Sequence, residues 1–148
     1  MDSADDIKSR IRRLLFSQKL AVLSTQGKDG PYTSLVAFVP YQHLKSILFA
    51  TPHYTQKYKN LKKTGRVALL IDNRENRSAD FRQGSALTIL GTANELQGES
   101  KKTSLSDYIK THPELKNFAF SSSTRLFRVD IRQYSLTTEF QNVEKLMP

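Results

Sequence analysis

The sequence predicts a mainly β domain: an antiparallel barrel or strongly bent sheet of about six or seven strands, flanked by about three or four helices. Three observations lead to this fold class. Short segments with the two-residue period of strands recur along the chain, separated by turn residues. One long strand segment has a central glycine, as barrel corners require. The length of 148 residues suits one domain spanning the whole chain, and no composition break divides it.

A helix followed by a β-hairpin is expected at the start of the chain. Apolar residues recur from Ile7 to Leu15 at helical spacing, which predicts an N-terminal helix over residues 1–18 with one apolar face. Two runs with strand periodicity, residues 20–24 and 32–39, then flank a polar turn that contains glycine at residues 26–31. This arrangement is typical of a β-hairpin.

A third strand, a second helix and a fourth strand follow. Residues 47–50 are a short apolar strand, and residues 51–57 lead into a helix that ends at Gly65. Residues 66–71 are continuously apolar after the first residue, which predicts a strand covered on both faces. The polar residues 72–80 are expected to connect strands at the rim of the sheet.

The second half of the chain predicts three more strands and a helical insert. Residues 85–96 form a long strand in which Gly91 marks a bulge or sharp bend. Residues 99–121 are a helical insert that covers one end of the barrel. Residues 127–132 alternate apolar and charged side chains and predict a half-buried strand. Residues 134–143 are expected to form a separate strand.

Composition restricts the class of protein. The chain has 23 basic and 14 acidic residues, a net charge of +9, and this surplus favours an anionic partner such as a nucleic acid, an anionic membrane or a phosphorylated small molecule. The absence of cysteine excludes disulfides and thiolate chemistry. The three histidines show no ligand spacing, so no metal site is expected. Without a secretion signal or a long apolar run, the expected location is the cytoplasm, with no membrane partner.

One segment has the composition of a phosphate site. Thr51, Thr55, Gln56 and Lys57 place hydroxyl, amide and ammonium donors at the start of a predicted helix. The free backbone N–H groups and the dipole of a helix start favour an anion. The alternative is that Thr55 only caps the helix and Lys57 is solvated. The usual motifs of hydrolase triads, Rossmann cofactors and P-loops do not occur in the chain.

The most basic stretch of the chain allows a second interpretation. Residues 57–66 carry five basic residues and no acidic one, next to Tyr54 and Tyr58. A basic barrel with neighbouring aromatic residues is typical of single-stranded nucleic-acid binding. The alternative is a hydrated helix face.

Six short blocks carry a resemblance to a known family. In chain order they are Leu20–Thr25, Gly30–Ser34, Leu48–Thr51, Thr55–Lys57, Asn60–Leu61 and Arg66–Leu70. Their order and spacing, from about residue 15 to residue 96, resemble the pyridoxamine 5′-phosphate oxidase-like family of FMN-binding split barrels. A weaker similarity runs from residue 126 to the end. The resemblance implies a split barrel that forms a homodimer, holds FMN at the subunit interface and acts as a flavin-dependent oxidoreductase on a small-molecule electron donor and acceptor.

The same resemblance implies which residues contact the cofactor. The phosphate falls on the segment that the helix-start argument selected, and the isoalloxazine ring lies against the second strand through its backbone. A segment after the fourth strand approaches the cofactor or the dimer interface, with a salt bridge at the rim as the alternative for Arg74. The implied cofactor-binding residues are Leu35, Val36, Ala37, Thr51, Thr55, Gln56, Lys57, Asn73 and Arg74. No side chain is identified as a catalytic acid or base.

Departures from the family pattern narrow the expected function. Gln56 stands where the vitamin-B6 oxidases of the family place an arginine, and the chain has no Arg-x-His pair and no tryptophan. Oxidation of vitamin-B6 phosphates is therefore not expected. Residues 139–143 replace the Gly-Phe-Gly sequence of the haem-utilising relatives. The cofactor is expected to be FMN, with another flavin or a deazaflavin as the alternative. A carrier that holds the cofactor without turnover is the alternative function, and nucleic-acid binding is the second alternative.

Overall fold

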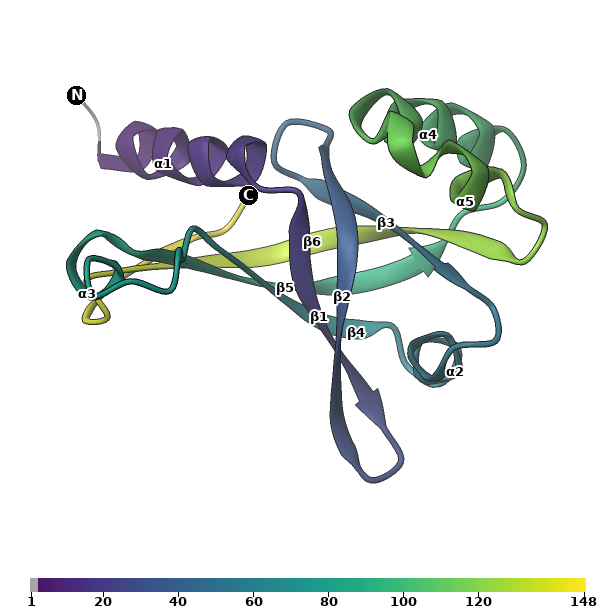
Figure 1. Cartoon of the computed structure of the whole chain (residues 1–148), viewed down its shortest axis with the longest axis horizontal. Coiled ribbons are helices and arrows are strands. Elements are labelled where there is room, and N and C mark those ends of the chain that lie inside the picture. The colour runs from purple at the N-terminus through teal and green to yellow at the C-terminus, as the bar shows by residue number, and fades with distance from the viewer. Residues whose placement is uncertain (1–2) are drawn as a thin grey trace.

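The computed structural model describes residues 3–148, so residues 1–2 of the expected N-terminal helix lie outside the described part. Six antiparallel strands close a barrel in the order β3-β2-β1-β4-β5-β6, and pairing of β3 with β6 completes the ring (Figure 1). A seventh strand pairs with β6 outside the ring. The predicted fold class is confirmed. The strands are β1 (Leu20–Gly27), β2 (Gly30–Tyr41), β3 (Ser46–Pro52), β4 (Arg66–Asp72), β5 (Ser85–Glu95), β6 (Thr124–Thr138) and β7 (Asn142–Leu146).

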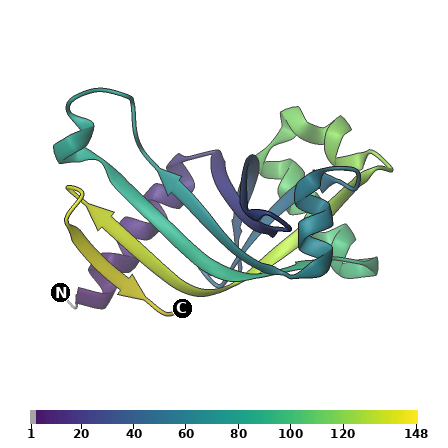
Figure 2. The same cartoon turned by 90° about the horizontal axis from the view of Figure 1, so that it is seen from below.

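Helices lie at two ends of the barrel. The helices are α1 (Ser3–Ser17), α2 (Gln56–Lys63), α3 (Asp80–Gln83), α4 (Gly98–Thr111), the 3₁₀ helix η1 (Pro113–Leu115) and α5 (Lys116–Phe120). Helices α1 and α3 lie at one end, and α2, α4 and α5 lie at the other (Figure 2). We call these the α3 end and the α2 end. Within residues 3–148 no helix combines the length and apolarity needed to cross a bilayer.

The barrel interior is a continuous apolar core. Phe49 and Phe127 stack face to face inside it, with ring centroids 5.3 Å apart. The apolar face predicted for the first helix is buried against the same core. A second, smaller core lies between the outer side of β3 and helices α4 and α5, where Leu48, Leu126 and Tyr108 are buried. The helical insert therefore covers β3 on the face that points away from the barrel.

A β-bulge bends the longest strand pair where the central glycine predicted it. The register of β5 with β6 shifts between Leu90 and Gly91, which leaves Arg132 as the extra residue on β6. A Cβ atom on Gly91 would lie 2.4 Å from the carbonyl oxygen of Asp130, so only glycine allows this approach. The extra residue reverses the in-and-out alternation along β6. The prediction of two separate strands over 127–132 and 134–143 is therefore wrong, because β6 continues through the bulge to Thr138.

The prediction that the fourth strand is covered on both faces is also wrong. Burial alternates along β4, and Leu70 is 36% exposed. Helix α4 covers the outer face of β2 from Ala37 onward. In the described residues, no helix covers the outer face of β1 and β4 or the part of β2 around Leu35. Pairing aligns Leu35, Val22 and Leu70 in one row across these three strands, and Leu35 is 65% exposed. The continuous apolar run in β4 therefore reflects a core face on one side and an uncovered apolar face on the other.

Candidate functional site

The start of α2 brings the predicted hydroxyl groups together. Thr55 is the N-cap residue, and its Oγ1 accepts a hydrogen bond from the N–H of Tyr58 at 3.3 Å. The same oxygen lies 2.8 Å from Oγ1 of Thr51, which is buried at the end of β3. In the described residues, the N–H groups of Gln56 and Lys57 have no acceptor. The cap thus satisfies part of the helix start and leaves two donors for an external acceptor.

Lys57 differs from the other lysines of α2. Its side chain is half-buried and lies on the same side of the helix as Leu61, which belongs to the barrel core. Burial lowers the pKa of Lys57 below its ordinary value. Within residues 3–148 it forms no ion pair, although Lys62 on the same helix lies 3.9 Å from Glu95. A partly desolvated ammonium without a counter-charge favours an anionic ligand.

Gln56 and Asn60 fix α2 against the hairpin. Nε2 of Gln56 donates to Oδ1 of Asn60 at 2.9 Å, and Nδ2 of Asn60 donates to Oγ1 of Thr25 at 3.0 Å. Asn60 and Thr25 are both buried. The side-chain amide of Gln56 therefore has a structural partner, while its backbone N–H remains available at the helix start.

Strand β2 leaves part of one edge without a strand partner. Its pairing with β3 begins at Phe38, opposite Phe49, and runs toward the end of β2. In an antiparallel pair, alternate residues direct both backbone groups to the same neighbour. The N–H of Phe38 donates to the carbonyl of Lys19, on the β1 side, at 3.2 Å. The N–H and C=O groups of Leu35 therefore point to the open edge, where a planar heterocycle can bind.

The other two residues predicted in this strand are less accessible than Leu35. Val36 is buried in the barrel core. The carbonyl of Ala37 accepts a hydrogen bond from the hydroxyl of Tyr108 at 3.2 Å. Only the Leu35 part of the predicted segment presents free backbone groups at the edge.

Sequence analysis did not single out Ser34. Its Oγ is buried and has no hydrogen-bond partner among residues 3–148. By strand alternation the side chain lies on the same face of β2 as Val36. A buried hydroxyl without a partner is costly, so this atom marks a place where a ligand can supply the missing bond. The only sequence signal for Ser34 is its place in the Gly30–Ser34 block.

Tyr108 of α4 and His112, the residue that follows this helix, hold the second half of β2. Tyr108 donates to Ala37 as described above, and Nε2 of His112 lies 2.8 Å from the carbonyl oxygen of Phe38. Burial raises the pKa of Tyr108 to about 12, which keeps its hydroxyl protonated as a donor. Tyr108 and His112 lie 71 and 74 residues beyond the strand residues that they contact, so no local pattern predicts them.

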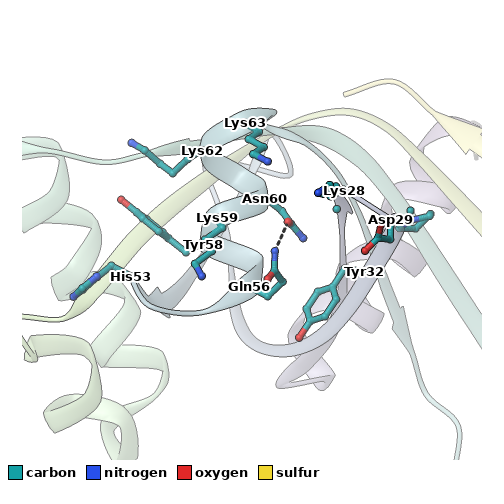
Figure 3. Close-up of a pocket in the computed structure, with 13 residues that line it drawn as sticks. Lys28, Asp29, Tyr32, His53, Gln56, Tyr58, Lys59, Asn60, Lys62 and Lys63 are labelled. Atoms are coloured by element: carbon teal, nitrogen blue, oxygen red, sulfur yellow. Dashed lines mark hydrogen bonds between the residues drawn. The ribbon is translucent and has the colours of Figure 1, made fainter.

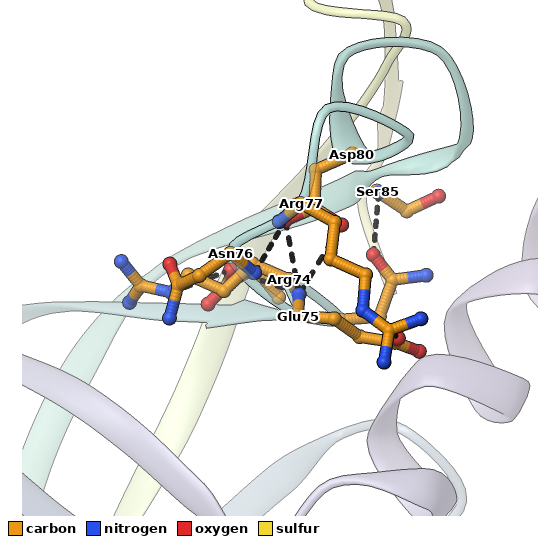
Figure 4. Close-up of polar contacts among 8 residues, drawn as sticks. Arg74, Glu75, Asn76, Arg77, Asp80 and Ser85 are labelled. Carbon is orange, nitrogen blue, oxygen red and sulfur yellow. Dashed lines mark hydrogen bonds and ion pairs between the residues drawn. The ribbon is translucent and has the colours of Figure 1, made fainter.

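Asn73 and Arg74 follow β4 and precede α3, at the α3 end of the barrel. Figure 4 shows Arg74 among the polar residues of this loop. Oδ1 of Asn73 accepts from the N–H of Ser85 at 2.7 Å. Nε of Arg74 lies 2.9 Å from Oδ2 of Asp72, so the rim salt bridge considered for Arg74 is present. Within one chain, β4 separates these residues from Lys57. A shared ligand would require a second copy of the chain.

A groove of about 810 Å³ runs between the turn of the β1–β2 hairpin and α2 (Figure 3). Lys28 and Tyr32 line it from the hairpin, and Gln56, Lys59 and Lys63 line it from the helix. We call this the lysine groove. It begins beside the helix start because Gln56 belongs to both places.

The closed antiparallel barrel, with a polar cradle where β3 gives way to α2, defines the class of split barrels. The sequence model of the family described as pyridoxamine 5′-phosphate oxidase matches residues 7–138, and the chain belongs to this family. The resemblance found in the sequence blocks is thereby confirmed. A relative from Schizosaccharomyces pombe, named a pyridoxamine 5′-phosphate oxidase homolog, is 30% identical over 124 residues, which cover 77% of this chain. The chain spans 65% of the length of that relative.

Solved structures with different ligands share the fold. A heme-binding protein from Mycobacterium smegmatis has a TM-score of 0.84 at 14% identity, covering 99% of this chain and 59% of that protein. A FAD-binding protein from Mesorhizobium loti has a TM-score of 0.71 at 14% identity, covering 86% of this chain and 90% of that one. At these identities the similarity establishes the fold alone.

Proposed function

We propose that this chain is a flavin-dependent oxidoreductase that binds FMN between two copies of the barrel. The observation that carries the proposal is the half-buried ammonium of Lys57, which has no ion pair in the described residues and lies beside the free N–H groups of the α2 start. A dianionic phosphate monoester satisfies both features at once. Membership of the pyridoxamine 5′-phosphate oxidase family supports the same ligand class.

The remaining parts of FMN have partners nearby. The backbone groups of Leu35 at the open edge of β2 match the alternating donors and acceptors of a flavin pyrimidine ring. Ser34, the neighbouring residue of β2, carries a buried hydroxyl without a partner on the same face of the strand as Val36. When bound, the flavin supplies the redox chemistry. The protein positions the ring, holds the phosphate and excludes water from one face.

A second copy of the chain is part of the proposal. The uncovered row of Leu35, Val22 and Leu70 is apolar on a face where solvent exposure is costly. Association across this face would cover the row and close the flavin site, which a single chain leaves open. Asn73 and Arg74 have polar partners in their own chain, so the proposal does not require either residue at the cofactor.

The dimer is tested by introducing a charge into this row. Leu35→Glu should leave the chain folded, because Leu35 is 65% exposed in a single chain, but convert the dimer into monomers that lose flavin. Sedimentation equilibrium at micromolar concentration measures this. A wild-type protein that is monomeric, or a variant that remains dimeric, would contradict the proposed arrangement.

One histidine is unavailable for haem, which a structural neighbour binds. An axial histidine needs a free ring nitrogen facing the ligand. Nε2 of His112 instead contacts the carbonyl of Phe38 at 2.8 Å. The flavin proposal uses the phosphate donors that are present at the α2 start.

The function is tested with purified protein and a panel of cofactors. The protein is loaded with FMN, passed through a desalting column and denatured, and about one FMN per chain is expected in the released fraction. A protein that retains neither FMN nor a deazaflavin contradicts the proposal. Reduction by NADH or NADPH without oxygen, followed by recovery of the yellow colour in air, would establish turnover. A bound flavin that no donor reduces would instead identify a carrier, and pyridoxine 5′-phosphate is included as a donor expected to be inactive.

A further inference from the structure

The lysine groove has a polar and aromatic lining on a rigid frame. Its helix wall is fixed relative to the hairpin, because Gln56 donates to Asn60 and Asn60 donates to Thr25. Apart from Pro31 and two glycines, the described lining consists of charged, amide and aromatic side chains. The groove therefore lacks the aliphatic pocket that an amphipathic peptide or an acyl chain requires.

The groove carries uncompensated positive charge on both walls. Lys28 lines it from the hairpin, and Lys59 and Lys63 line it from the exposed side of α2. None of the three forms an ion pair within residues 3–148, and Asp29 is the one acidic residue in the described lining. Lys59 and Lys63 are one helical turn apart, about 6 Å along the axis, so the positive charge repeats along the groove. Opposed walls of one charge concentrate the potential between them, and its repetition favours a chain of anionic groups over a single ion.

The free aromatic ring of the groove is Tyr32. It is 42% exposed and faces the groove from β2 (Figure 3). Of the two tyrosines beside the basic stretch of the sequence, Tyr54 lies outside the described lining, and the hydroxyl of Tyr58 donates to Glu95 at 2.7 Å. Tyr58 also packs edge-on against Phe127, with ring centroids 5.9 Å apart. An exposed ring on a rigid wall is a stacking surface for a base, and stacking accepts any base.

We propose that the lysine groove binds single-stranded nucleic acid, with its phosphates between the two lysine-bearing walls and one base stacked on Tyr32. An acidic peptide would match the cations but not the ring, and a duplex keeps its bases paired and unavailable for stacking on a side chain. The cations of the groove are exposed lysines of both walls, whereas the proposed flavin phosphate uses the half-buried Lys57, which is not part of the described lining. The inference therefore does not depend on the proposed flavin function.

The experiment must separate the groove from the overall charge, because a protein with a net charge of +9 attracts any polyanion. Binding of labelled probes to the full chain is measured by fluorescence anisotropy at about 0.15 M salt, where the Debye length is about 8 Å. Oligothymidylate and oligouridylate of about 12 nucleotides represent single-stranded DNA and RNA. An abasic strand of the same length has the phosphates without the bases, and polyglutamate of equal charge has neither. Both oligonucleotides are expected to bind about 5-fold or more tightly than these two probes, the gain from one stacked base.

A pair of double variants tests the position of the site. Lys28→Ala/Lys63→Ala removes one cation from each wall and should weaken oligothymidylate binding about 10-fold or more. It should also reduce the slope of log K against log salt concentration by about 1.4, because each phosphate contact on a single strand contributes about 0.7. The control Lys110→Ala/Lys116→Ala removes the same charge from exposed positions on α4 and α5. It should weaken binding less than about threefold and leave the slope unchanged.

Substitution of Tyr32 tests stacking separately from charge. Tyr32→Ala should weaken oligothymidylate binding about 5-fold or more and leave binding of the abasic strand unchanged. Tyr32→Phe keeps the ring and should retain the affinity of the wild type.

Three results would overturn the inference. Equal losses in the two double variants would show that overall charge, rather than the groove, attracts the strand. An abasic strand or polyglutamate that binds as tightly as oligothymidylate would show that no base is recognised. Failure of both oligonucleotides to bind at micromolar protein would exclude the site outright. FMN binding, measured on the same preparations, tests the proposed flavin function independently of all three.

Discussion

Both ends of the barrel carry a basic residue next to the end of a strand. The basic residue at the α3 end has an acidic partner, whereas the one at the α2 end has none in the described residues. At the α3 end, Arg74 contacts the carboxylate of Asp72, and the carboxylate of Asp80 accepts from the N–H groups of Glu75, Asn76 and Arg77 (Figure 4). At the α2 end, Lys57 has no ion pair in the described residues. A loop that satisfies its own polar groups maintains its shape without a ligand. A helix start that leaves an ammonium and two N–H groups free gains stability only when an anion arrives.

Removal of Lys57 tests the α2 side of this comparison and has the largest expected effect. Lys57→Ala should weaken FMN binding by about 1.5–3 kcal/mol, the range for a hydrogen bond to a charged group, and leave the fold intact. Lys59→Ala is the matched control, because Lys59 is two residues away on the same helix and exposed. It should change FMN affinity by less than about 0.5 kcal/mol. Equal affinities of the two variants in a fluorescence titration would remove Lys57 from the site.

Removal of Asp80 tests the α3 side. Its carboxylate accepts from the N–H of Asn76 at 2.8 Å and from that of Glu75 at 2.9 Å. Asp80→Ala leaves these donors without their acceptor and should lower the free energy of unfolding by about 1–2 kcal/mol. Urea denaturation of the cofactor-free protein measures this. Asp80→Asn keeps one acceptor oxygen, so its free energy of unfolding should lie between those of the wild type and Asp80→Ala. A variant that loses only FMN affinity would contradict a structural role for Asp80.

Local patterns predicted the barrel and the helix start, because both depend on neighbouring residues. Strand period, the turn glycines and Gly91 indicate a bent antiparallel sheet, and a capping threonine followed by a lysine indicates an anion-binding helix start. The two errors in the strands have a common cause. Periodicity shows which residues are apolar but not what covers them. In β4 the outward residues are apolar although no helix covers them in the described residues, and in β6 the bulge at Arg132 reverses the alternation.

The unpredicted part of the site depends on contacts that are distant in sequence. Tyr108 of α4 and His112, the residue that follows this helix, contact β2 across more than 70 residues. Ser34 becomes notable only because the fold buries its hydroxyl without a partner. Such features have no local signature, since burial is decided by the whole chain rather than by the neighbouring residues.

Arg74 tests the same comparison with a smaller expected effect. Removal of a cation that has an acidic partner should change FMN affinity little, whereas removal of the unpaired Lys57 should change it strongly. Nε of Arg74 contacts Asp72 on the surface, and its side chain is 57% exposed. Exposed ion pairs contribute about 0–1 kcal/mol. Arg74→Ala should therefore change both the free energy of unfolding and FMN affinity by less than about 1 kcal/mol. A loss of FMN affinity as large as that of Lys57→Ala would contradict this expectation and show that Arg74 contacts the cofactor from the second copy of the chain.

The smallest expected effect is a change in the free energy of unfolding whose sign depends on whether FMN is bound. Burial lowers the pKa of Lys57 in the folded chain, so the folded state binds its proton less tightly than the unfolded state does. This desolvation cost is fully present at neutral pH. It disappears as the pH rises from the lowered pKa toward 10.5, the ordinary value, because the folded state releases the proton first.

Lys57→Met should therefore make the cofactor-free protein slightly more stable at pH 7, by less than about 1 kcal/mol, and the FMN-loaded protein less stable. Thermal unfolding with and without FMN, at pH 7 and pH 9.5, measures both signs. A cofactor-free variant less stable than the wild type at pH 7 would mean that Lys57 has a structural partner, and the contrast between the two ends would fail.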